Sequence, residues 1–443
     1  MNSNILLRMG LDPDDFCDGD ETVKSSDGYD YYFEMKRPSE CPRCHSKDII
    51  AFGPRERRFN ASVNPNIRET IHVRYSRIMC HSCHHASAPK IRGVVGKKQT
   101  PRVIDRMIAA DLGRETTIKG IAAEYHVSSP YVINAMDALF RDVPRHALTP
   151  FLCIDEFGYA RSGPGRYPFI LVDGSTSRLL DVVKSRQWAY MSPYFRSIPP
   201  KERESVTYFS SDMYDPYKSI RNEYFPGAEH AVCMFHIVKQ TTFALNVARA
   251  RSAGRDPFDS AECRFAKVHW QILLLREGEI PAKVFTPAAK GMDPIGFRAA
   301  VEAVMAKYPQ LLPIWDALQA LYSLVDGKAA RPYGEEMGWI IRKLLDSGVP
   351  QAIDAAGTYK RWERQIRRTF ELREKGIMIS NSHAEGANSN IASYIKISRG
   401  CPDFERFRKR CLLIYGLRDY DQTTNDLTEK AVIGLNKTTN NNQ

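Results

Sequence analysis

The chain has 443 residues, with 63 lysines and arginines against 52 aspartates and glutamates, so its formal net charge at pH 7 is +11. A chain of this length usually folds as two to four domains. No run of apolar residues is long enough for a membrane span, and the first residues are too weakly apolar for a secretory signal. We therefore expect a cytoplasmic protein.

The charge is unevenly distributed along the chain. Residues 1–34 contain nine acidic residues against Arg8 and Lys24, which leaves +18 for the rest once the −7 of this segment is subtracted from +11. A basic body favours a polyanionic partner such as nucleic acid, although a basic enzyme of another kind would carry the same charge. We expect residues 1–38 to form an acidic flexible segment and residues 426–443 a disordered polar tail.

Two Cys-x-x-Cys pairs come next, separated by segments in which apolar and polar residues alternate. The pairs are Cys41 with Cys44 and Cys80 with Cys83. Four thiolates at this spacing predict one structural Zn²⁺ ion, and the alternation predicts a hairpin, so residues 39–92 should form a zinc ribbon. Unliganded thiols are the alternative, and a neighbouring histidine could replace one cysteine. The histidines close enough in sequence are His45, His81, His84 and His85.

Residues 99–145 have the pattern of a helix-turn-helix DNA-binding domain. Ser129 is the expected cap of the second helix, and this helix would present Tyr131 and Asn134, with Ser129, to the major groove. His126 stands at the turn position that often holds glycine. An ordinary helical hairpin is the alternative.

The central region predicts an α/β fold with a ribonuclease-H-like catalytic core. Three consecutive strands are followed by helix, strand, helix and strand, which is the order of that core. The first part of the core should cover residues 150–252 and the last part residues 376–425, with a helical insertion at residues 253–375 between them.

Three acidic residues stand at matching positions on the expected core elements. Asp155 lies in the first strand, Asp212 ends the fourth strand, and Glu385 lies on the last core helix. The first and fourth strands are neighbours in this topology, so the three carboxylates should converge. Oxygen ligands of this kind suit two Mg²⁺ or Mn²⁺ ions that promote displacement at a phosphodiester. On the same helix, Asn388 and Lys396 are candidates for DNA contacts, and Arg399 just after it is another.

Several of these stretches resemble the DDE transposases of the ISL3 insertion-sequence family. They are "CIDEF", "SSDMYDPY", "MFHIVK" and "HAEGANSNIASYIKISRG", followed by "FERFRKR", and the resemblance extends over roughly residues 38–420. It implies that Asp155, Asp212 and Glu385 form the catalytic triad. It also places His236 at a recurrent family histidine near the site, where an auxiliary role and a structural role at a helix start are both open.

The resemblance implies a transposase that binds the terminal inverted repeats of an insertion sequence and catalyses metal-dependent cleavage and strand transfer. Double-stranded DNA would be its partner, self-association into a dimer or higher oligomer on DNA is expected, and the protein would be associated with the bacterial nucleoid. A catalytically silent DNA-binding regulator and another ribonuclease-H-like nuclease are the alternatives. A zinc hydrolase is disfavoured, because four cysteine ligands leave no position for a substrate.

Overall fold

The computed structural model divides the chain into two compact units. One comprises Met1–His146 with Ser389–Gln443, and the other comprises Ala147–Asn388. The polar tail expected at 426–443 lies outside the described residues, and within them no helix is long and apolar enough to cross a bilayer. The described residues are 3–19, 21–94, 100–141, 143–159, 163–256, 260–286, 294–377, 382–398 and 403–416.

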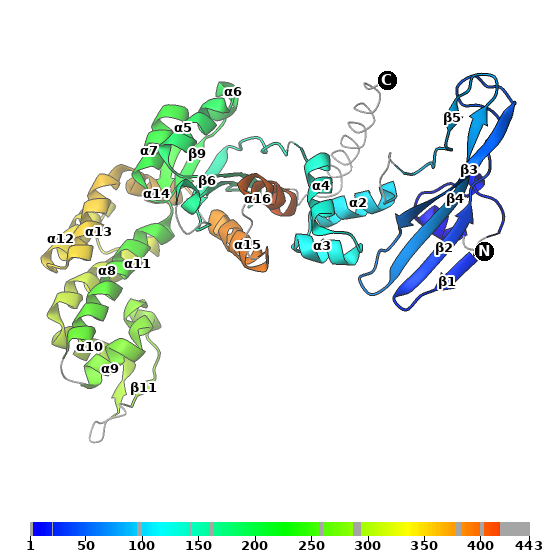
Figure 1. Ribbon diagram of the computed structural model, residues 1–443. Helices are drawn as coiled ribbons and strands as arrows, with labels where there is room; N and C mark the ends of the chain where they lie inside the picture. The colour runs from blue at the N-terminus through cyan, green and yellow to red at the C-terminus, as the bar shows by residue number, and fades with distance from the viewer. Residues whose placement is uncertain are drawn as a thin grey trace. The chain divides into compact units, whose positions relative to one another are not determined.

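The first unit begins with a short helix and a mixed sheet (Figure 1). The sheet order is β1-β2-β4-β3, with β5 paired to β4. The long strands β3 and β4 form an antiparallel hairpin, and β2 lies parallel to β4. The bounds are α1 (Ser3–Arg8), β1 (Glu21–Lys24), β2 (Gly28–Glu34), β3 (Ile49–Asn60), β4 (Arg68–Cys80) and β5 (Ala86–Ser87).

The acidic N-terminal segment is not the flexible segment that its composition predicts. Strands β1 and β2 belong to the sheet, and Leu6 of α1 is buried in the core of the unit. One of its carboxylates is also neutralised locally, since Arg92 pairs with Asp15 through two hydrogen bonds. The apolar and aromatic side chains that alternate with the acids therefore outweigh the polar composition.

Three helices follow the sheet in the same unit, namely α2 (Arg102–Asp111), α3 (Ile118–Glu124) and α4 (Ser129–Leu139). The cap of α4 is Ser128, whose side chain accepts the Tyr131 N–H, so Ser129 is the first helical residue and not the predicted cap. His126 adopts a left-handed conformation with φ of 47°, which explains how it occupies a turn position that usually needs glycine.

The end of the described chain packs on this unit, contrary to the expectation that residues 376–425 all belong to the catalytic core. The boundary between the units falls inside α15 (Ser382–Ser398), and α16 (Phe404–Cys411) and the π-helical turn Leu412–Gly416 lie in the first unit. Arg410 is buried there, and its guanidinium donates to the carbonyl groups of Leu112, Arg114 and Thr116. These bonds join α16 to the loop after α2.

The second unit is built on a five-stranded mixed sheet with the order β10-β9-β6-β7-β8. Strands β6, β7 and β8 are successively antiparallel, whereas β9 lies parallel to β6. This pairing confirms the predicted adjacency of the first and fourth strands. Helices α5 and α7 share an apolar core with one face of the sheet (Figure 1). The bounds are β6 (Phe151–Glu156), β7 (Phe169–Asp173), β8 (Leu179–Val183), α5 (Trp188–Ser197), α6 (Pro200–Glu204), β9 (Tyr208–Ser211), α7 (Asp215–Tyr224) and β10 (Glu229–Val232).

Helices dominate the rest of the second unit. One apolar cluster joins them to β10 and α8, with Trp362 fully buried in it. Thr369 bonds both the N–H and the carbonyl of Val232, which fixes α14 against β10. The bounds are α8 (Met234–Arg255), α9 (Ala261–Val268), β11 (Val284–Phe285), β12 (Ile295–Gly296), α10 (Phe297–Lys307), α11 (Leu312–Val325), α12 (Tyr333–Asp346), α13 (Pro350–Arg361) and α14 (Glu363–Glu374).

Replacing the buried Arg410 by methionine should destabilise the first unit by about 3 kcal/mol, because the three carbonyl groups that it bonds would lose their charged donor. The matched control is Lys409→Met on the same helix, which has no ion-pair or hydrogen-bond partner among the described side chains and should change stability by less than about 0.5 kcal/mol. Urea unfolding of both variants measures the difference. Equal stability of the two variants would contradict the structural role of Arg410.

Candidate active site and metal centres

Asp155 lies near the end of β6, an otherwise apolar strand, and is only 7% exposed. Its carboxylate accepts the N–H of Glu156 over 2.9 Å and the side-chain amide of Asn388 over 2.9 Å. Burial, followed by the charge of Glu156, raises the pKa of Asp155 to about 7. The charged form is therefore disfavoured near neutral pH unless a cation compensates it.

Asp212 lies beside Asp155 because of the strand register. Cys153 of β6 is paired with Ser210 of β9, and each aspartate comes two residues later on parallel strands. Burial, then the charges of Glu156 and Asp155, raise the pKa of Asp212 to about 7. The two predicted aspartates are therefore close enough to repel each other.

Glu156 is engaged in contacts of its own. It forms an ion pair with Arg186 and accepts the hydroxyl of Tyr217 over 3.1 Å. A carboxylate held by an arginine and a tyrosine is less available as a ligand than Asp155.

Glu385 approaches the same site from α15. Asn388, one turn further along, donates to Asp155 Oδ2 and to the carbonyl of Glu156, and so fixes this end of α15 against β6. Burial raises the pKa of Glu385, and its charge contributes to the raised pKa of Asp155. The structure thus brings together all three predicted acids.

Two neighbours of Glu385 add a thiol and an imidazole. Cys233 Sγ and His236 Nδ1 each lie 3.9 Å from Glu385 Oε1, and the three donor atoms lie within 4.8 Å of one another, a spacing that could hold a metal ion. Burial, followed by Lys239, lowers the pKa of His236 to about 4, so its imidazole is neutral, as metal binding requires.

Sequence reasoning missed Cys233. The available signal was the Cys-x-x-His spacing at the start of α8, where Cys233 caps the helix and His236 lies in its first turn.

The four cysteines of the first unit form a second cluster. Their sulfur atoms lie within 4.8 Å of one another, with 3.7 Å between Cys41 and Cys83 and 3.5 Å between Cys44 and Cys80. The N–H of Arg43 donates to Cys41 Sγ and lowers its pKa. Four sulfur atoms at this spacing match the ligand set of a structural zinc ion, so the cluster is compatible with a zinc ribbon.

The neighbouring histidines lie outside this cluster. His45 contacts Glu40 over 3.1 Å and His81 contacts Asp48 over 3.5 Å. His45 and His84 each follow the second cysteine of a pair. Both have a positive φ, so they occupy the same position in two equivalent turns.

The residues predicted to contact DNA have different fates. The Tyr131 hydroxyl donates to Asp105 Oδ1 over 2.6 Å, and burial raises the pKa of Tyr131. We expected this hydroxyl to face the major groove, but it is engaged inside the unit. Ser129 is half-buried, while Asn134 and Lys396 are exposed. Arg399 lies outside the described residues.

Asn388 was also predicted to contact DNA, and its side-chain amide donates to Asp155 Oδ2.

The chain matches one known protein family over its central and C-terminal parts. The model of the DDE transposases of ISL3 type, described as "Transposase", matches residues 152–411, more than half of the chain. The chain therefore belongs to the ISL3 family of transposases. This membership implies DNA as the partner and agrees with a ribonuclease-H-like core, and DDE transposases generally use divalent metal ions. No curated protein sequence matches the chain.

The pKa of Asp212 predicts a pH-dependent stability in the absence of divalent ions. A carboxyl whose pKa is about 7 in the folded protein and 3.8 otherwise stabilises the fold in its protonated form, and this contribution is lost as the pH rises through 7. The free energy of unfolding of Asp212→Asn should therefore fall less between pH 5 and pH 8 than that of the wild type. Thermal unfolding measures this, and Mn²⁺ at pH 8 should stabilise only the wild type. Identical pH profiles would contradict the assignment.

Replacing Cys80 by serine should abolish zinc binding and unfold the hairpin end, since three thiolates hold zinc less well than four. Cys17→Ser is the control, because Cys17 is exposed and lies outside the cluster. Atomic absorption of the purified proteins should find zinc in the wild type and in the control only. Full zinc content in Cys80→Ser would exclude this cluster as the site.

Proposed function

We propose that this protein is the transposase of an insertion sequence, which binds the terminal inverted repeats of the element and catalyses DNA cleavage and strand transfer with Asp155, Asp212 and Glu385. The observation that carries the proposal is the convergence of these acids from β6, β9 and α15, with the pKa of each raised. Such a group is costly without compensating cations, which favours a catalytic over a structural role.

The donor set fits divalent cations. Three carboxylates provide the oxygen ligands that Mg²⁺ and Mn²⁺ prefer. Asn388 Oδ1 and His236 Nδ1 are buried and have no hydrogen-bond partner among the described residues, and both flank the same acids. A pair of bound divalent ions would activate the attacking oxygen and stabilise the leaving oxygen at phosphorus.

The protein's own residues position these ligands. Asn388 orients Asp155 through its side-chain amide, and the N–H of Tyr214 holds Asp212 Oδ1 over 3.0 Å. Arg186 keeps Glu156 in an ion pair. His236, neutral and with Nδ1 3.9 Å from Glu385 Oε1, is an auxiliary residue whose Nδ1, free of hydrogen bonds among the described residues, could add a nitrogen ligand beside this carboxylate.

Recognition of DNA is assigned to the first unit. Helices α3 and α4 correspond to the predicted helix-turn-helix, and Asn134 is exposed on α4 where a base edge could be read. The cysteine cluster would hold one structural Zn²⁺ ion and stiffen the hairpin. Because two element ends must be joined, the active form should be a dimer or a higher oligomer on DNA.

Glu385→Gln should lower excision of a marker flanked by the native element ends by at least about 100-fold, because a carboxylate ligand is lost while the shape is kept. Glu335→Gln, an exposed glutamate on α12, is the control and should excise like the wild type. Binding of both variants to the terminal repeats should be unchanged.

Undiminished excision by Glu385→Gln would contradict the proposal. End binding without cutting by the wild type would favour a silent regulator, and cutting without preference for the ends would favour another nuclease.

A further inference from the structure

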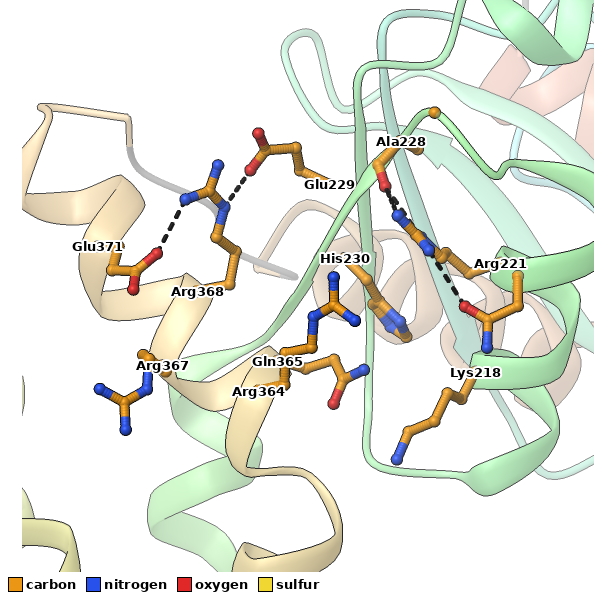
Figure 2. A pocket seen from close by; sticks show the side chains of 12 residues that line it. Lys218, Arg221, Ala228, Glu229, His230, Arg364, Gln365, Arg367, Arg368 and Glu371 are labelled. Carbon is orange, nitrogen blue, oxygen red and sulfur yellow. Dashed lines mark hydrogen bonds and ion pairs between the residues drawn. The ribbon is translucent and has the colours of Figure 1, made fainter. Parts of the chain in front are cut away.

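A basic cleft lies in the second unit between α7, β10 and α14. Its volume is about 580 Å³. Five cationic side chains line it, with Lys218 and Arg221 on α7 and Arg364, Arg367 and Arg368 on α14, as Figure 2 shows. The sequence did not predict this cluster of cations, because they come from helices more than 130 residues apart.

The cations of this cleft are only partly neutralised. Arg368 is paired with Glu229 and Glu371, so both acidic residues of the lining are already used. Arg367 is paired with Glu363. The three remaining cations have no such pair.

Lys218, Arg221 and Arg364 have no ion-pair partner among the described residues. Lys218 donates to the carbonyl of Arg361 and lies over the ring of Trp362, 4.2 Å from its centroid, and Arg221 donates to the carbonyl of Ala228. Burial and then the charge of Arg364 lower the pKa of Arg221, so these groups repel one another. An anion in the cleft would relieve that repulsion.

The lining favours a phosphodiester backbone over a nucleotide. The lining side chains are mainly charged or polar, and the single aromatic ring among them, His230, is only 6% exposed, so the lining offers little stacking surface for a base. Guanidinium and ammonium groups instead suit the phosphate oxygens of a nucleic-acid backbone.

The cleft is also connected to the catalytic strands. His230, which lines it and is 6% exposed, contacts the hydroxyl of Ser211 over 2.9 Å, and Ser211 directly precedes Asp212. Helix α7 begins at Asp215, three residues after Asp212. A strand of DNA held by this cleft would therefore be anchored to the elements that carry one of the proposed catalytic acids.

We propose that this cleft binds the phosphate backbone of duplex DNA through Lys218, Arg221 and Arg364, as a contact separate from the helix-turn-helix and from the three acids. The choice of DNA as the polyanion rests on the proposed function.

The test compares Arg364→Glu with Arg342→Glu in the full-length protein. Both arginines are exposed on helices without an ion-pair partner among the described residues, but Arg342 lies on α12 outside the cleft. Binding to a random-sequence duplex is measured by fluorescence anisotropy at several salt concentrations, without Mg²⁺ and without chelator. Arg364→Glu should bind at least about 5-fold more weakly, with the slope of log affinity against log salt reduced by about 1. Arg342→Glu should bind within about 2-fold of the wild type.

Equal affinities and slopes for the two variants would overturn the proposal. Arg364→Gln provides a second variant if the charge reversal lowers the unfolding temperature, and it should show a smaller loss in the same direction. Failure of the proposed function is seen separately, as a wild type that binds DNA but does not cut it. In that case a selective loss of binding by Arg364→Glu would still establish the cleft.

Discussion

The second unit depends on the burial of Asp155 beside Asp212 at the end of two parallel strands. Isolated, these carboxylates would disfavour the folded protein at neutral pH, because burial and the charges of neighbouring carboxylates raise the pKa of each to about 7. The register of β6 and β9 holds this pair in place, and the side-chain amide of Asn388 bonds Asp155 from α15, the helix that carries Glu385. In a family of transposases, such an unfavourable group supports the proposal that cations bind there.

The first unit is organised by different interactions. Its cysteine cluster brings two turns of similar geometry together at one end of the β3–β4 hairpin. Arg410 bonds α16 to three carbonyl groups in the loop after α2. The acidic N-terminal segment completes the sheet and is partly neutralised by Arg92. The positive charge that remains lies elsewhere on the protein. Part of it lines the cleft between α7 and α14.

Much of the second unit could be predicted from the sequence, because the order of its strands places Asp155 and Asp212 side by side whatever the helices do. The role of Asn388 could not, since a polar residue on a helix face has the same pattern whether it bonds a carboxylate or DNA. The burial of Arg410 was equally hidden, as arginine is usually exposed. The two strands within residues 1–38 were missed because acidic composition was given more weight than the alternating aromatic residues.

The most direct test of the central claim is the anomalous diffraction of crystals soaked in Mn²⁺ near pH 8. The account predicts manganese peaks bounded by the carboxylates of Asp155, Asp212 and Glu385, and no such peaks in crystals of Asp212→Asn. Crystals of the wild type without manganese between these carboxylates, at a concentration that saturates other sites, would contradict it. The three acids would then be a structural cluster that stays protonated.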